Sequence, residues 1–178
     1  MKTIFNSDIT KEDLHNVNYK YQLELTSKLD DLNGNFNQEI INEIVLWKVN
    51  RYSFIDDEAF ALLNQINNED KVLNLEVTTQ ILTKLLNTKG IQLAMASTIL
   101  RFKNPNIYQI IDQRVYRFIY GSEIPKYFSS NEKQIELYTD YLQKLNQVCI
   151  EKEIDFRLSD RIIYELDKLY NKEIKIKY

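Results

Sequence analysis

Asp112 is the residue of this 178-residue chain whose type and setting most directly suggest chemistry. It follows the apolar pair Ile110-Ile111 and opens a predicted amphipathic helix that carries Arg117. Backbone amides at a helix start hold a carboxylate in its ionised form. Such a fixed negative charge can stabilise positive charge that develops on a reacting carbon. The same position also fits an ordinary helix N-cap that only accepts a backbone amide.

A predicted helical hairpin lies upstream of Asp112 and turns on Gly90. Apolar residues recur with helical spacing on both sides of the turn. Gly90 can adopt backbone angles closed to other residues, and the free amides that begin the second helix then favour an anion such as phosphate. Lys89 lies on the turn, where it can meet a phosphate or simply be solvated. The apolar positions are Ile81, Leu82, Leu85 and Leu86 before the turn and Leu93, Ala96, Ile99 and Leu100 after it.

The order of Gly90, Ile91, a turn residue and, further on, small Ala96 resembles the helix-hairpin-helix motif of DNA-binding proteins. Asp112 strengthens the match. Asp112 lies 22 positions after Gly90. Helix-hairpin-helix DNA glycosylases of the endonuclease III type have a catalytic aspartate at the same separation from the first hairpin glycine. In that family an arginine follows five residues later, and Arg117 matches it here. The resemblance covers residues 78 to 120 and places the hairpin at residues 78 to 102.

The resemblance implies a DNA N-glycosylase, a hydrolase that flips a damaged or modified base out of double-stranded DNA and cleaves its glycosidic bond. Asp112 would be the catalytic residue. Base-excision repair of the genome and defence against foreign DNA with modified bases, such as that of a phage, both fit. The expected DNA-binding residues are Lys89, Gly90, Ile91, Gln92, Arg114 and Arg117, and the candidate base pocket is Trp47, Tyr52 and Tyr108. Trp47 also fits an ordinary core residue.

Three departures from the family narrow what the resemblance implies. Gln92 stands where the family has a second glycine, which leaves open whether the hairpin holds phosphate or a monovalent cation. Ala94 stands where bifunctional members have the lysine that forms a Schiff base, so an enzyme without AP-lyase activity is implied. Cys149 is the only cysteine, which rules out the four-cysteine iron–sulfur cluster of some relatives. Beyond a cation at the hairpin, we expect no metal or other cofactor.

The composition predicts an all-α protein. Hydrophobic residues make up 44% and charged residues 28%, as in ordinary globular domains, while only 3 glycines and 2 prolines argue against a fold with many tight turns. We expect a compact bundle of roughly 7–9 helices. It would form a single domain over residues 1–178, with two lobes and a cleft near Asp112 as the alternative. We also expect a monomer.

Further expectations concern compartment and charge. The sequence has neither a membrane-spanning apolar run nor a signal-peptide pattern at Met1-Lys2-Thr3, and a lone cysteine is typical of the reducing cytoplasm. The net charge is -3, yet residues 89–126 hold six basic and two acidic residues, a balance of +4. A local basic face of this kind can attract phosphates, although a solvated surface explains it equally well.

Helix caps follow from local sequence. We expect Asn37 to cap a central helix packed on two sides, Asp56 to cap the next, and Gly121 to end the helix that follows Asp112. Further expected caps are Thr78 or Thr79 for the first hairpin helix, Asn131 for a long amphipathic helix and Ser159 for the last one, with residues 173–178 as a short strand or a frayed end. Two alternatives to a glycosylase stay open: a DNA-binding module without catalysis, favoured by Gln92, and a helical protein-interaction domain.

Overall fold

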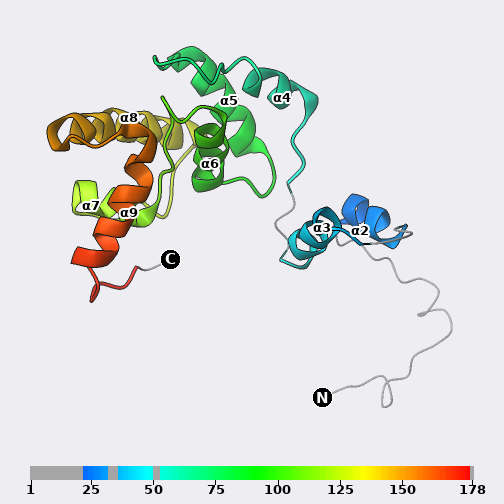
Figure 1. Ribbon diagram of the computed structural model, residues 1–178. Coiled ribbons are helices and arrows are strands. Elements are labelled where there is room, and N and C mark those ends of the chain that lie inside the picture. The colour runs from blue at the N-terminus through cyan, green and yellow to red at the C-terminus, as the bar shows by residue number, and fades with distance from the viewer. Residues whose placement is uncertain (1–21, 32–35, 50–52, 177–178) are drawn as a thin grey trace. The chain divides into compact units, whose positions relative to one another are not determined.

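The computed structural model describes residues 22–31, 36–49 and 53–176. Within these residues it contains eight α-helices, one short 3-10 helix and no strand, which confirms the all-α class (Figure 1). Residues 173–176 are irregular, so the predicted strand is absent from that part of the tail. None of the described helices is long and apolar enough to cross a membrane. The helices are α2 (Leu23–Asp30), α3 (Gln38–Lys48), α4 (Asp57–Leu63), α5 (Leu75–Asn87), α6 (Leu93–Lys103), α7 (Gln113–Tyr120), α8 (Asn131–Lys152) and α9 (Ser159–Tyr170), with η1 (Phe156–Leu158) before α9.

The chain divides into two compact units, residues 1–52 and 53–178. The single domain over residues 1–178, with two lobes as its alternative, stays a prediction. No Gly-, Pro- or Ser-rich segment marks the boundary, which explains why the sequence did not indicate it. In the first unit the indole Nε1 of Trp47 donates to Thr26 Oγ1 over 2.9 Å and joins α3 to α2. Asn37 caps α3 as predicted, but none of the described residues of this helix is buried. The expectation of a central helix packed on two sides stays a prediction.

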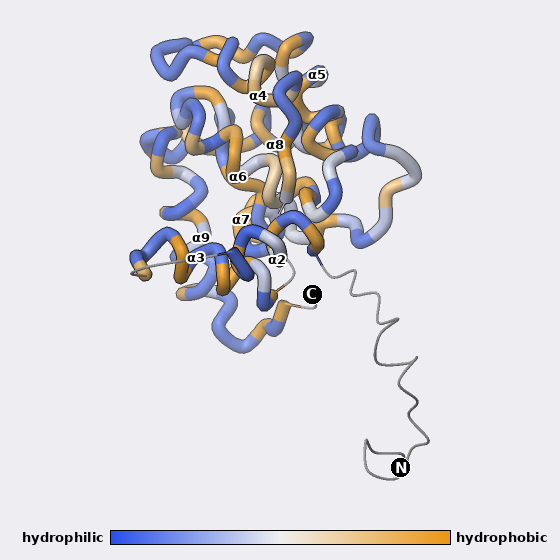
Figure 2. The backbone as a smooth tube through the Cα atoms, turned by 90° about the vertical axis from the view of Figure 1, so that its right-hand side faces the viewer, coloured by the Kyte–Doolittle hydropathy of each residue, from blue (hydrophilic) through white to orange (hydrophobic). Residues whose placement is uncertain are grey.

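The second unit has one hydrophobic core, to which α5, α6, α7, α8 and α9 all contribute. Hydrophobic and hydrophilic residues alternate along these helices (Figure 2). Cys149 is buried in this core, as predicted, and burial raises the pKa of its thiol. Asp56 caps α4 and Gly121 ends α7 in the left-handed conformation with φ 69°, both as predicted. The helix start at Asp56 and the helix end at Gly121 were predicted correctly, because a cap depends on neighbouring residues alone.

The helices α5 and α6 form the predicted hairpin, with residues 88–92 as the turn. Gly90 has φ 87°, a conformation that side-chain-bearing residues rarely adopt, and the amide of Ile91 donates to the carbonyl of Thr88 over 3.1 Å. The first helix begins earlier than expected, because Asn74 is its cap. Thr78 instead lies buried and shares a 2.7 Å hydrogen bond with the hydroxyl of Tyr108.

Two further caps lie one residue before the predicted position. Ser130 precedes α8, which begins at Asn131, and Leu158 precedes α9, which begins at Ser159. Neither cap makes a side-chain hydrogen bond to its helix. Ser159 is already part of the helix and donates to the carbonyl of Phe156 in the preceding 3-10 turn. The 3-10 turn η1 leads directly into α9, so the helix begins one residue earlier than predicted. The local sequence did not indicate this turn.

A buried ion pair fastens α7 to α9, which lie side by side (Figure 1). The Arg117 guanidinium makes two 2.7 Å hydrogen bonds to the Asp167 carboxylate, in the bidentate geometry typical of strong pairs. Arg114 and Asn171 also donate to this carboxylate, which is fully buried. Burial raises the pKa of Asp167, but the hydrogen bonds from Arg117, Asn171 and Arg114 outweigh it, and the pKa lies below its ordinary value.

Replacing Asp167 with Asn is expected to lower the free energy of unfolding by about 3–5 kcal/mol, because a buried guanidinium loses its charge partner. Unfolding in urea followed by far-ultraviolet circular dichroism measures this difference. Since the folded-state pKa is lowered, the stabilisation is fully present above the unfolded-state pKa of about 3.9 and is lost as the pH falls through the folded-state value. The difference between wild type and variant should therefore be constant near neutral pH and shrink in acid.

Glu165→Gln is the matched control, because Glu165 lies on the same helix but is exposed and pairs with Lys168 at the surface. Surface pairs contribute about 0–1 kcal/mol, so this variant should unfold almost as the wild type does. An Asp167→Asn variant as stable as the control would contradict the assigned role of the α7–α9 pair.

Candidate functional site

The extended segment 109–111 delivers Asp112 to the surface of the second unit. The hydroxyl of Tyr138 donates to the carbonyl of Gln109 over 3.0 Å, and that of Tyr141 donates to the carbonyl of Ile110 over 2.7 Å. The amide of Ile111 donates to Ser97 Oγ on α6. Because its backbone groups are bonded to two different helices, the segment has a defined path, and the position of Asp112 is fixed with it.

Asp112 is the N-cap of α7, and its side chain is half-buried. One carboxylate oxygen, Oδ1, accepts the backbone amide of Arg114 over 2.7 Å. Among the described residues, none donates a hydrogen bond to the other oxygen. The cap bond thus orients the carboxylate and leaves one oxygen for a ligand or for water.

A cleft of about 660 Å³ brings Asp112 together with the start of the second hairpin helix. Its walls come from the end of the hairpin turn, the beginning of α7, the loop between α7 and α8, and the first turn of α8. The cleft lies entirely within the second unit. The lining residues are Gln92, Leu93, Ala94, Ile111, Asp112, Gln113, Ile124, Pro125, Lys126, Tyr127, Phe128 and Gln134. We call this space the hairpin cleft.

Two aromatic and three amide side chains line the hairpin cleft, beside five aliphatic residues. Tyr127 is 92% exposed and Phe128 is half-buried, both in the loop between α7 and α8. The side-chain oxygen of Gln113 accepts the amide of Ile124 over 3.0 Å and so anchors this loop to α7. Planar rings beside amide donors and acceptors suit a planar, hydrogen-bonding ligand such as a nucleobase.

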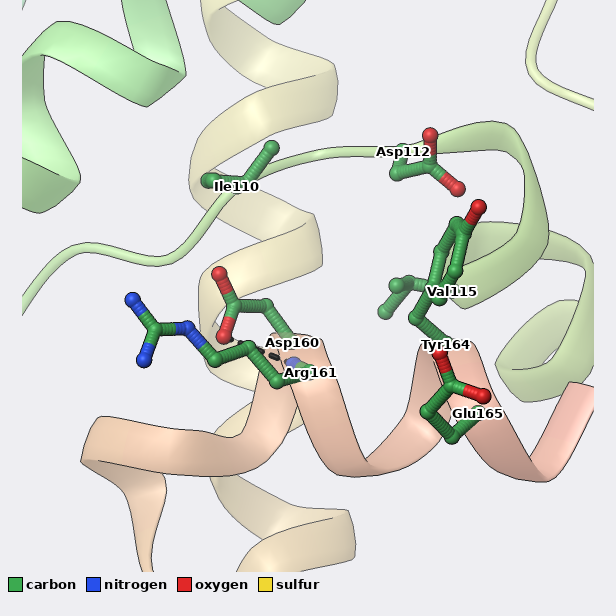
Figure 3. Close-up of a pocket in the computed structure, with 7 residues that line it drawn as sticks. All are labelled: Ile110, Asp112, Val115, Asp160, Arg161, Tyr164 and Glu165. Atoms are coloured by element: carbon green, nitrogen blue, oxygen red, sulfur yellow. Dashed lines mark hydrogen bonds between the residues drawn. The ribbon is translucent and has the colours of Figure 1, made fainter.

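A second hollow of about 460 Å³ lies against Asp112, between the start of α7 and one face of α9. Figure 3 shows the Tyr164 ring reaching up from α9, with its hydroxyl toward the Asp112 carboxylate. Asp160 and Glu165 also line this hollow. Asp160 is buried and its carboxylate lies 3.7 Å from Arg101 Nε. Among the described residues that line this hollow, Asp112, Asp160 and Glu165 outnumber the one basic residue, Arg161, and we call it the acidic hollow.

The predicted DNA-binding residues do not form one surface. Lys89, Gly90 and Gln92 are exposed at the hairpin turn, whereas the side chain of Ile91 is buried in the core. For Arg117 the prediction is wrong, since its side chain is only 9% exposed and its guanidinium is bonded to Asp167.

Arg114 is half-buried, and its part in DNA binding stays a prediction. Its Nη1 atom bonds to Asp167 Oδ2 over 3.1 Å, and its guanidinium lies 5.6 Å from the centre of the Tyr164 ring. Arg101, a third arginine of the basic stretch 89–126, is buried against Asp160. Two of the six cations counted in that stretch, Arg101 and Arg117, are therefore buried, and the expected basic face is weaker than the sequence suggested.

The three residues predicted to form a base pocket have different outcomes. Tyr108 is 1% exposed and bonded to Thr78, so its assignment to an open pocket is wrong. Trp47 is half-buried in the first unit, where it bonds to Thr26, and its part in a base pocket stays a prediction. Tyr52 lies outside the described residues.

Sequence reasoning missed the loop that closes the hairpin cleft. Tyr127 and Phe128 stand side by side in a segment bounded by Gly121 and α8, and Pro125 precedes them. Two adjacent aromatic residues in a loop were the available signal, because a loop rarely buries such large side chains. Gln134 had no local signal, since only the fold brings the first turn of α8 to the cleft.

Comparison of the chain with models of protein families, with curated proteins and with solved structures finds no match. Within the described residues, no group of three or more His, Cys, Asp or Glu side chains is placed to hold a metal ion.

Replacing Asp112 with Ala is expected to lower the free energy of unfolding by about 1 kcal/mol, because α7 loses its cap bond. Asp112→Asn should unfold almost as the wild type does, since asparagine is an equally good N-cap. Urea unfolding of both variants beside the wild type checks this pair. If both variants are equally destabilised, the carboxylate charge itself stabilises the fold, and the asparagine variant is no clean probe of chemistry.

Proposed function

We propose that this protein is a monofunctional DNA glycosylase that removes a damaged or modified base from DNA. The observation that carries the proposal is the hairpin cleft, in which an oriented carboxylate, Asp112, and the start of the second hairpin helix line the same space. The helix start supplies free backbone amides that favour a phosphate, and the cleft is large enough for a base. The sequence resemblance to helix-hairpin-helix glycosylases supports the same conclusion.

In the proposed reaction the bond between the sugar carbon and the base nitrogen breaks, and its electron pair leaves with the base. Positive charge then develops on the sugar, where the ionised Asp112 carboxylate stabilises it electrostatically. Water adds to the sugar carbon, one of its protons is transferred to the departing base, and the products are a free base and an abasic site. Asp112 Oδ2 is the oxygen available for this role, because Oδ1 is held by the amide of Arg114.

The amines near Asp112 support the proposal of an enzyme without strand cleavage. Ala94 lines the hairpin cleft at the position where the resemblance would put the lyase lysine of bifunctional enzymes. Of the described residues lining the cleft, only Lys126 carries an amine. Lys126 is exposed on the loop between α7 and α8, so we assign it to contact with a phosphate rather than to Schiff-base chemistry.

A DNA-binding module without catalysis is the second candidate. The observation in its favour is that Asp112 already performs a complete structural task as the N-cap of α7. In such a module the carboxylate would contribute to stability alone, and the hairpin turn would bind the DNA backbone. The two candidates differ in whether an abasic site appears.

Oligonucleotides that carry a panel of modified bases, incubated with the full chain and then heated in alkali, test the glycosylase. We expect strand breaks at one or more of the modified positions. Asp112→Asn should lower the excision rate by at least about a hundredfold, because the charge that stabilises the transition state is lost while the cap is kept. Excision at an undiminished rate in this variant would contradict the assigned role of Asp112.

Two controls accompany this assay. Glu165→Gln removes a carboxylate from the acidic hollow and not from the hairpin cleft, so it should excise at the wild-type rate. Treatment with borohydride during the reaction should trap no covalent complex, and a trapped complex that disappears in Lys126→Arg would show that the enzyme is bifunctional. Breaks at none of the modified bases, together with binding to DNA, would select the module.

A further inference from the structure

We infer that the hairpin cleft takes a base that is already unpaired, so that the preferred substrate is single-stranded or locally unpaired DNA rather than matched duplex. This inference rests on the proposed function and names its substrate class. Two features of the second unit support this inference. The first is the aromatic loop between α7 and α8, which holds Tyr127 and Phe128, and the second is the small number of cations available to bind the phosphates of a duplex.

The first feature is the exposure of the aromatic loop. Tyr127 is 92% exposed while it lines the cleft, and Phe128 lines the same wall. An exposed ring gains nothing from the core, but it offers a flat face on which a base can stack, and every base has such a face. Because the bond between Gln113 Oε1 and the amide of Ile124 anchors this loop, the rings stay near Asp112.

The second feature is the shortage of free cations. Binding to a duplex draws most of its affinity from Lys and Arg side chains that neutralise phosphates, and a base must then be extracted from the stack at a cost in free energy. Arg101 and Arg117 are buried in ion pairs with Asp160 and Asp167, and the half-buried Arg114 is bonded to Asp167 as well. Of the described residues that line the cleft, Lys126 alone is basic. An unpaired base avoids the cost of extraction and relies on stacking.

Fluorescence anisotropy of end-labelled oligonucleotides with ordinary bases measures the preference directly. The full chain is titrated with one sequence as a single strand, as a matched duplex and as a duplex with one bulged base, all at the same salt concentration. We expect the single strand and the bulged duplex to bind about tenfold more tightly than the matched duplex. Equal or tighter binding of the matched duplex would overturn the inference.

Substitutions in the loop separate stacking from charge. Tyr127→Leu and Phe128→Leu should each weaken single-strand binding by about tenfold, while Tyr127→Phe keeps the ring and should bind as the wild type does. Tyr170→Leu is the control, since Tyr170 is a 71% exposed tyrosine of α9 that does not line the cleft. Full binding by both leucine variants in the loop, or an equal loss in the control, would also overturn the inference.

The outcomes distinguish this inference from the proposed function. If modified bases are excised but matched duplexes bind best, the glycosylase stands and the inference fails. If no base is excised yet the single-strand preference depends on Tyr127 and Phe128, the glycosylase fails and the cleft is a stacking site for unpaired bases. A chain that binds none of the three oligonucleotides at low salt overturns both.

Discussion

The carbonyl groups of Gln109 and Ile110 lie in the interior of the second unit without a helix or sheet to bond to, and two tyrosine hydroxyls of α8 satisfy them. Buried carbonyls without a partner would cost free energy comparable to a lost hydrogen bond, so the path of this segment depends on Tyr138 and Tyr141. Both side chains are fully buried, and burial raises their pKa values well above the ordinary range, which keeps the hydroxyls protonated as donors. The place of Asp112 follows from this constraint.

The α7–α9 ion pair fixes the helix that Asp112 begins, since Arg117 and Arg114 both bond to the buried Asp167. It also takes the charge of Arg117 away from the surface, whereas Arg157 and Arg161 are exposed. Under the proposed function, the buried Arg101 and Arg117 contribute no phosphate contacts, so stacking and the amides of a helix start supply a larger share of the affinity.

Local sequence predicted much of the fold. The caps at Asn37 and Asp56, the helix end at Gly121 and the turn at Gly90 were all found, because each depends on the residue itself and its close neighbours. The cap at Asp112 was found in the same way, although its catalytic role was an inference from spacing.

The failures concern residues whose partners lie far away in sequence. Arg117 was assigned to DNA because nothing near it shows that Asp167, 50 positions on, would take its charge. Tyr108 was placed in a pocket because its bond to Thr78 spans 30 positions. The Tyr127–Phe128 loop was missed because the walls of the hairpin cleft come from four separated segments. Pairings of this kind are set by tertiary packing, which a single sequence does not disclose.

Trp47 is the only tryptophan of the chain, and its indole bonds to Thr26 within the first unit. The fluorescence of an indole excited at wavelengths that tyrosine does not absorb therefore reports on the surroundings of α2 and α3. Trp47 thus gives the first unit an optical label of its own, and the melting of that unit can be followed in an unmodified sample.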